Sequence, residues 1–119
     1  MTKILLAEDD DSLRSFLTSA LRRAGHDIQS YEDGDSALAA LEQEVFDLLL
    51  TDIQMPGIDG IELARRGAEL DPAMKIVFIT GFAAVALSNK SNTPAGAKIL
   101  SKPFHLRELV DEVERVMAA

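Results

Sequence analysis

Several polar residues of this sequence directly follow short apolar runs, and their side chains are of types that take part in phosphoryl chemistry. Glu8 and Asp9 follow KILLA, Asp52 follows DLLLT, Thr80 ends KIVFIT, and Lys102 follows KILS. Short apolar runs that alternate with helical patterns indicate βαβ units with parallel strands. Because open α/β sheets place their ligand sites at the carboxyl ends of the strands, we expect these side chains to lie close together.

The acids of this group predict a site for a hard cation. Carboxylates gathered at one edge repel one another unless a cation is bound, and Mg²⁺ (or Mn²⁺) prefers a few carboxylates with water and phosphate oxygens. Glu8, Asp9 and Asp52 are the candidate ligands. Asp52 is also the predicted nucleophile, because a carboxylate can accept a phosphoryl group as an acyl phosphate. A cap or turn carboxylate is the simpler interpretation of a lone aspartate at a strand end.

The elements that must position these residues follow from apolar periodicity and turn signals. Strands are expected over residues 3–7, 26–31, 46–52, 75–80 and 98–102. Helices are expected from Asp10 or Asp11 to Gly25, from about Ser36, from Ile61 to Leu70, from Phe82 to Asn89, and along a final face of Leu106, Leu109, Val110, Val113 and Met117. This alternation predicts an α/β fold, a flavodoxin-like (βα)5 doubly wound parallel sheet with strand order 2-1-3-4-5. The elements use residues 1–119, so we expect a single domain without an effector domain.

Some residues have simpler interpretations than a place in the site. Asp10 and Asp11 are interpreted as helix caps or solvated acids. Phe16 belongs to the apolar repeat of the first predicted helix. His26 and His105 do not stand among the acids, and both are interpreted as surface residues.

Composition and charge exclude several classes of function. The 119 residues include 20 acidic and 12 basic side chains for a net charge of −8, without a stripe of Lys and Arg that could neutralise nucleic-acid phosphates. Direct nucleic-acid binding is therefore not expected. The sequence has no cysteine for disulfide or thiol chemistry. Its first apolar run is only a strand long and leads into acids, which predicts a cytoplasmic protein without a signal peptide or membrane span.

Motifs at the predicted edge closely resemble the receiver domain of two-component response regulators. They are Glu8-Asp9, Asp52 with the following IQMPGIDG, Thr80-Gly81, and Lys102-Pro103-Phe104. The resemblance implies that Asp9 binds Mg²⁺ directly, that Glu8 does so directly or through water, and that the backbone carbonyl of Gln54 adds a ligand. It also implies that the Lys102 ammonium and the Thr80 hydroxyl contact the phosphoryl group, and that the bond between Lys102 and Pro103 is cis.

The sequence departs from the pattern of this family at two positions. Glu8 replaces an aspartate that is frequent in the acidic pair, and Ile99 takes the place of an aromatic residue whose ring moves with the threonine hydroxyl. An aliphatic side chain cannot reproduce that movement, so the response is expected to depend more on the loop and helix after Thr80. In that helix, Phe82, Val85 and Leu87 are candidates for a partner surface.

The resemblance implies a signalling switch that receives a phosphoryl group from the phosphohistidine of a sensor histidine kinase or a histidine phosphotransferase. Its own catalysis would be slow self-phosphorylation and self-hydrolysis, and its output would be binding to a downstream protein. The segments KILSKPFHLRELV and TGFAAVAL also resemble CpdR-type single-domain regulators, which implies an adaptor for the ClpXP protease. A phosphorelay intermediate and a pseudo-receiver without phosphorylation are the alternatives. An aspartyl-phosphate phosphatase is disfavoured, because Gln54 stands where a second acid is needed.

Overall fold

A computed structural model describes residues 2–81 and 96–118 of the chain. A five-stranded parallel sheet with strand order β2-β1-β3-β4-β5 forms the middle layer, in agreement with the predicted topology. The strands are β1 (Lys3–Ala7), β2 (Asp27–Tyr31), β3 (Leu48–Asp52), β4 (Lys75–Thr80) and β5 (Lys98–Ser101). The helices are α1 (Asp11–Arg23), α2 (Gly34–Gln43), α3 (Gly60–Leu70) and α5 (Leu106–Ala118). The predicted helix from Phe82 to Asn89 lies outside the described residues.

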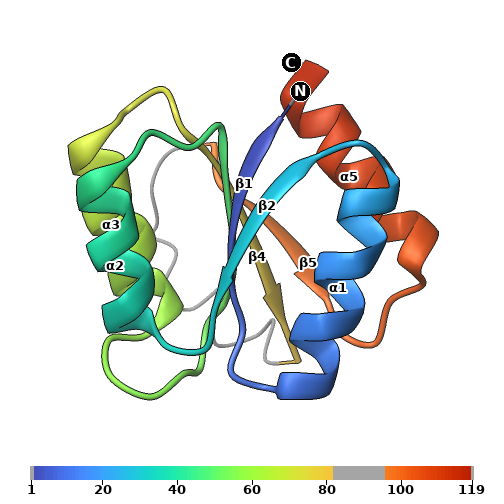
Figure 1. The fold of residues 1–119 in the computed structure, drawn as a ribbon, viewed down its shortest axis with the longest axis horizontal. Coiled ribbons are helices and arrows are strands. Elements are labelled where there is room, and N and C mark those ends of the chain that lie inside the picture. The colour runs from blue at the N-terminus through green and yellow to red at the C-terminus, as the bar shows by residue number, and fades with distance from the viewer. Residues whose placement is uncertain (1, 82–95, 119) are drawn as a thin grey trace.

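Helices cover both faces of the sheet, and this explains why the central strands lack polar alternation. Figure 1 shows α2 and α3 on one side of the sheet and α1 and α5 on the other. In β3, Leu49 belongs to the apolar cluster on the side of α2 and α3, whereas Leu48 and Leu50 belong to the cluster on the side of α1 and α5. Successive side chains of a strand point to opposite faces, so a strand that is covered on both faces must be apolar throughout.

Helices α1, α2 and α3 are preceded by aspartates that accept hydrogen bonds from the first turn. Asp10 caps α1 through the N–H of Leu13, Asp33 caps α2, and Asp59 caps α3. Helix α2 therefore begins at Gly34, two residues before the predicted start at Ser36, because Asp33 takes the capping position. These caps fix where each helix leaves the carboxyl edge of the sheet.

Three side chains differ from their predicted environments. Phe16 is 54% exposed, since α1 turns its buried stripe, which includes Leu17 and Leu21, toward the sheet. Val116 is buried in α5 although it was not expected on the packed face. His26 is half-buried, and its Nε2 atom is enclosed. The turn after α1 folds back here, and the backbone N–H of His26 donates to the Leu21 carbonyl. The surface interpretation of His26 is therefore wrong.

A helix that crosses a lipid bilayer needs about 20 predominantly apolar residues, and the described helices do not meet this requirement.

Candidate functional site

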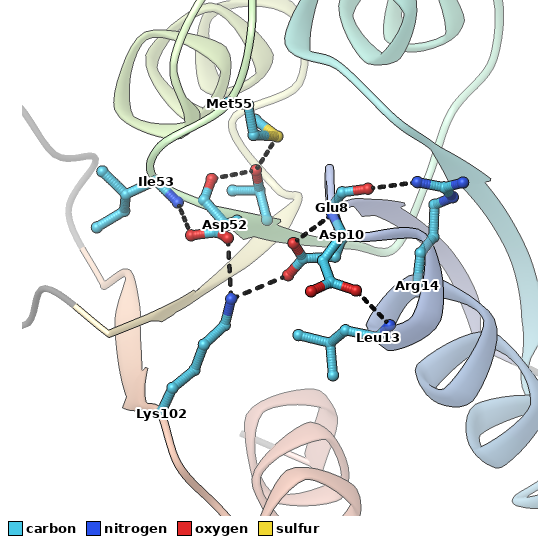
Figure 2. A network of polar contacts seen from close by, with 9 residues as sticks. Glu8, Asp10, Leu13, Arg14, Asp52, Ile53, Met55 and Lys102 are labelled. Atoms are coloured by element: carbon cyan, nitrogen blue, oxygen red, sulfur yellow. Dashed lines mark hydrogen bonds and ion pairs between the residues drawn. The ribbon is translucent and has the colours of Figure 1, made fainter.

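The carboxyl ends of three strands bring together a lysine and two acids. The Nζ atom of Lys102 lies 2.9 Å from Oδ2 of Asp52 and 3.2 Å from Oε1 of Glu8, although these residues are 50 and 94 positions apart in the chain. Figure 2 shows the ammonium between the two carboxylates. The predicted meeting of the β1, β3 and β5 ends is thus observed in the structure.

Backbone pairing explains how these ends meet. Strand β3 lies between β1 and β4, and Asp52 pairs with Ile79 of β4 at the last position of that register. Thr80, the next residue of β4, is buried and pairs with Ser101. The N–H of Lys102 donates to the Thr80 carbonyl at 2.7 Å, and the following bond to Pro103 is cis. Asp52 and Thr80 therefore stand at the end of a hydrogen-bonded strand, and Glu8 and Lys102 each stand one residue beyond a strand end.

The carboxylate of Asp52 is held by the segment that follows it. One of its oxygens, Oδ1, accepts the N–H of Ile53 at 2.7 Å, while the other contacts Lys102. The N–H of Gly60 donates to the Ile53 carbonyl at 2.7 Å, and a Cβ atom at Gly60 would lie 1.9 Å from the Asp52 carbonyl oxygen. A glycine at position 60 thus allows the start of α3 to approach the backbone of Asp52 closely.

Glu8 is the most deeply buried acid of the site, with no exposed surface. Its Oε2 atom accepts the N–H of Asp10 at 3.1 Å, and its Oε1 atom faces Lys102. Burial raises the pKa of Glu8 to about 7, and the charge of Asp52 adds to this, whereas the Asp10 N–H and Lys102 oppose it. For Lys102, burial lowers the pKa, but the hydrogen bond to Asp52 and the two neighbouring carboxylates outweigh burial and leave the pKa raised.

The acids also fit a bound cation. Glu8, Asp9 and Asp52 each offer a carboxylate oxygen, and these three oxygens lie within 4.8 Å of one another. Burial is the main reason for the raised pKa of Glu8, and a divalent ion beside this carboxylate would favour its charged form. Asp9 is exposed, so its side chain can reach an ion from the solvent side. Carboxylate oxygens are ligands that Mg²⁺ prefers, and an ammonium is a partner for phosphate oxygens.

The other predicted residues lie around this centre or beyond the described part. Ile99 is half-buried and packs against the apolar cluster between the sheet and α2 and α3. Gln54 is exposed two residues after Asp52. Phe82, Val85 and Leu87 lie outside the described residues, so the proposed partner surface stays a prediction.

Arg14 contacts the site although it was not among the predicted residues. Its Nη1 atom donates to the backbone carbonyl of Glu8 at 2.9 Å, and its Nη2 atom donates to Asp11 at 2.5 Å. A signal was available, since an arginine in the first turn of a helix can reach back over the acidic segment that precedes it. Apolar periodicity does not predict this contact, because the contact depends on the path of the chain between β1 and α1.

Comparison with known proteins identifies the family of the chain. Residues 4–114 match the response regulator receiver domain family. The chain is 58% identical over 119 residues to the response regulator receiver protein CpdR of Brucella abortus (strain 2308), covering 100% of this chain and 99% of that protein. It is 34% identical to the response regulator protein FleR of Pseudomonas aeruginosa over 95% of this chain and 24% of that protein. The crystal structure of a response regulator receiver protein from Sinorhizobium medicae WSM419 matches with a TM-score of 0.91 and 35% identity, over 99% of this chain and 95% of that one.

The chain therefore belongs to the response regulator receiver domain family. Its fold and its acidic edge are those of a phosphorylation switch of two-component signalling, and CpdR is a full-length relative. Receiver domains bind Mg²⁺ through acidic residues, in agreement with the cluster of Glu8, Asp9 and Asp52.

Proposed function

We propose that this protein accepts a phosphoryl group on Asp52 from the phosphohistidine of a sensor kinase or a phosphotransferase. The observation that carries the proposal is the Asp52 carboxylate, 2.9 Å from the Lys102 ammonium and within 4.8 Å of two further acids. A nucleophilic carboxylate, a fixed cation and a cluster of metal-binding oxygens are the parts that phosphoryl transfer needs.

Each residue of the site has a distinct role in the phosphoryl transfer. A carboxylate oxygen of Asp52 forms the new bond to phosphorus while the bond between phosphorus and the donor nitrogen breaks, and the nitrogen retains the electron pair. Lys102 then stabilises charge on the phosphoryl oxygens, and the Thr80 hydroxyl contacts one of them. Asp9, Asp52, the Gln54 carbonyl and Glu8, directly or through water, would hold Mg²⁺. The metal would supply screening of the acids and charge neutralisation at the phosphoryl oxygens.

Two features of the site favour this proposal over a phosphatase or an unphosphorylated pseudo-receiver. Turnover of an outside substrate needs a second acid after the nucleophile, but Gln54 is an amide and is exposed. A pseudo-receiver would not need an acceptor carboxylate beside a lysine, so the contact between Asp52 and Lys102 and the presence of Thr80 favour phosphorylation.

An acyl-phosphate donor with Mg²⁺ provides the direct test. Intact mass spectrometry should show one phosphoryl adduct on the wild-type protein, and hydroxylamine should remove it. Asp52→Asn should lose the adduct, whereas Asp111→Asn, an exposed aspartate of α5, should keep it. An adduct of equal yield on Asp52→Asn would refute the assignment of the acceptor.

The output of the switch is proposed to be regulated binding to a protein target. The 58% identity to CpdR over the whole chain supports an adaptor for the ClpXP protease, and a phosphorelay intermediate is the alternative. Two measurements distinguish the adaptor from the relay intermediate: binding of the unmodified and the phosphorylated protein to purified ClpX, and transfer of the phosphoryl group to a phosphotransferase. An adaptor should change its affinity on phosphorylation, whereas a relay intermediate should instead pass the phosphoryl group to a phosphotransferase histidine.

A further inference from the structure

The connection between β1 and α1 is held on both sides of Asp9. The preceding peptide carries the Glu8 carbonyl, which accepts Nη1 of Arg14 at 2.9 Å. The following peptide carries the Asp10 N–H, which donates to Oε2 of Glu8 at 3.1 Å. Fixing the peptide groups on both sides of a residue restricts its backbone dihedral angles, and therefore the direction of its side chain.

The Arg14 side chain is suited to hold this connection. Strand β1 ends at Ala7, so the Glu8 carbonyl lies beyond the strand, and Arg14 supplies a donor for it. The side chain of Arg14 is only 19% exposed, and its second nitrogen is oriented by Asp11. Its backbone N–H also donates to the Asp10 carbonyl at 2.8 Å, within the first turn of α1. Figure 2 shows the guanidinium reaching back from α1 to the Glu8 backbone.

We propose that Arg14 is a positioning residue of the cation site: its guanidinium holds the Glu8–Asp9 peptide so that the Asp9 and Glu8 carboxylates converge with Asp52. The proposal rests on the proposed function, because it assigns Arg14 to the Mg²⁺ site that phosphorylation would use. Arg14 would not itself touch the metal or the phosphoryl group.

Charge and position predict opposite effects of Arg14 on Mg²⁺ binding. A positive guanidinium near an acidic pocket repels a divalent cation, so its removal alone should strengthen Mg²⁺ binding. If Arg14 instead holds the acids in place, its removal should weaken binding in spite of the lost repulsion. Groups that orient metal ligands from outside the coordination sphere are worth about 10- to 100-fold in metal affinity. Because Arg14 acts through the backbone, we expect about the lower end of that range.

The test is direct Mg²⁺ titration of the metal-free protein by calorimetry. Arg14→Gln removes the charge and the guanidinium that makes both hydrogen bonds, whereas Arg14→Lys keeps the charge but lacks the fork that contacts the Glu8 carbonyl and Asp11 together. Arg23→Gln is the matched control, since Arg23 lies exposed in the last turn of the same helix. Urea unfolding of each variant without metal separates a changed Mg²⁺ affinity from a loss of folding.

The proposal expects both Arg14 variants to raise the Kd for Mg²⁺, by about tenfold for Arg14→Gln, while the control stays at the wild-type value. Tighter binding by Arg14→Gln, or wild-type binding by Arg14→Lys, would overturn it. If Arg14→Gln does not fold, Arg14→Lys alone decides the question. Formation of the phosphoryl adduct on the wild-type protein tests the proposed function separately. The role of Arg14 and the phosphorylation of Asp52 can therefore be refuted independently.

Discussion

Replacing Glu8 with glutamine should remove a large part of the pH dependence of folding stability in metal-free protein. The pKa of Glu8 is about 7 in the folded protein, against 4.5 ordinarily, chiefly because the side chain is buried. A raised pKa means that the folded state holds the proton more tightly than the unfolded chain. This stabilisation is fully present below 4.5 and is lost as the pH rises through about 7.

The size of the effect follows from the same two pKa values. A tenfold change in proton affinity is worth about 1.4 kcal/mol. The difference between 4.5 and about 7 therefore corresponds to roughly 3 kcal/mol of unfolding free energy, lost across that window. The raised pKa of Lys102 does not interfere, because that contribution is lost only as the pH rises above 10.5.

Urea unfolding with a chelator present, at several pH values across this window, measures the effect. The unfolding free energy of wild type should fall relative to that of Glu8→Gln as the pH rises, whereas Glu114→Gln, an exposed glutamate of α5, should follow wild type. Saturating Mg²⁺ should flatten the wild-type dependence, since a bound cation favours the ionised acid. Parallel pH profiles for wild type and Glu8→Gln would refute the reasoning.

Three further variants test the elements that position the site, each by urea unfolding. Leu49→Ala should cost about 2–5 kcal/mol, because Leu49 is fully buried in the central strand; a cost below about 1 kcal/mol would contradict this. Gly60→Ala should destabilise the protein, and also weaken Mg²⁺ binding, because its Cβ atom would lie 1.9 Å from the Asp52 carbonyl oxygen. An unchanged Mg²⁺ affinity would show that the approach of α3 does not affect the site. Asp33→Ala should cost about 1 kcal/mol through loss of the cap on Ser36, and no loss would mean that another group caps α2.

The order of elements and the identity of the edge residues could be predicted from local patterns. Residues 48–52 are apolar up to Thr51 and Asp52, and a strand of that kind is found only where helices cover both faces. Parallel strands place their carboxyl ends at one edge of the sheet, so the sequence predicts that Glu8, Asp52 and Lys102 lie close together. The caps at Asp10 and Asp59 are likewise local signals, because each acts within three residues of itself.

Tertiary structure decided what depends on burial and on distant neighbours. The sequence shows that Glu8 is an acid, but its pKa of about 7 arises from complete enclosure and from Asp52, 44 residues away in the chain. The exposure of Phe16 depends on which face α1 packs against the sheet, and the enclosure of the His26 Nε2 atom depends on the turn after α1. Arg14 acquires its contact only when α1 folds back over the end of β1. Helical periodicity sets which side chains share a face, whereas packing against other elements sets their solvation, and solvation determines their charge.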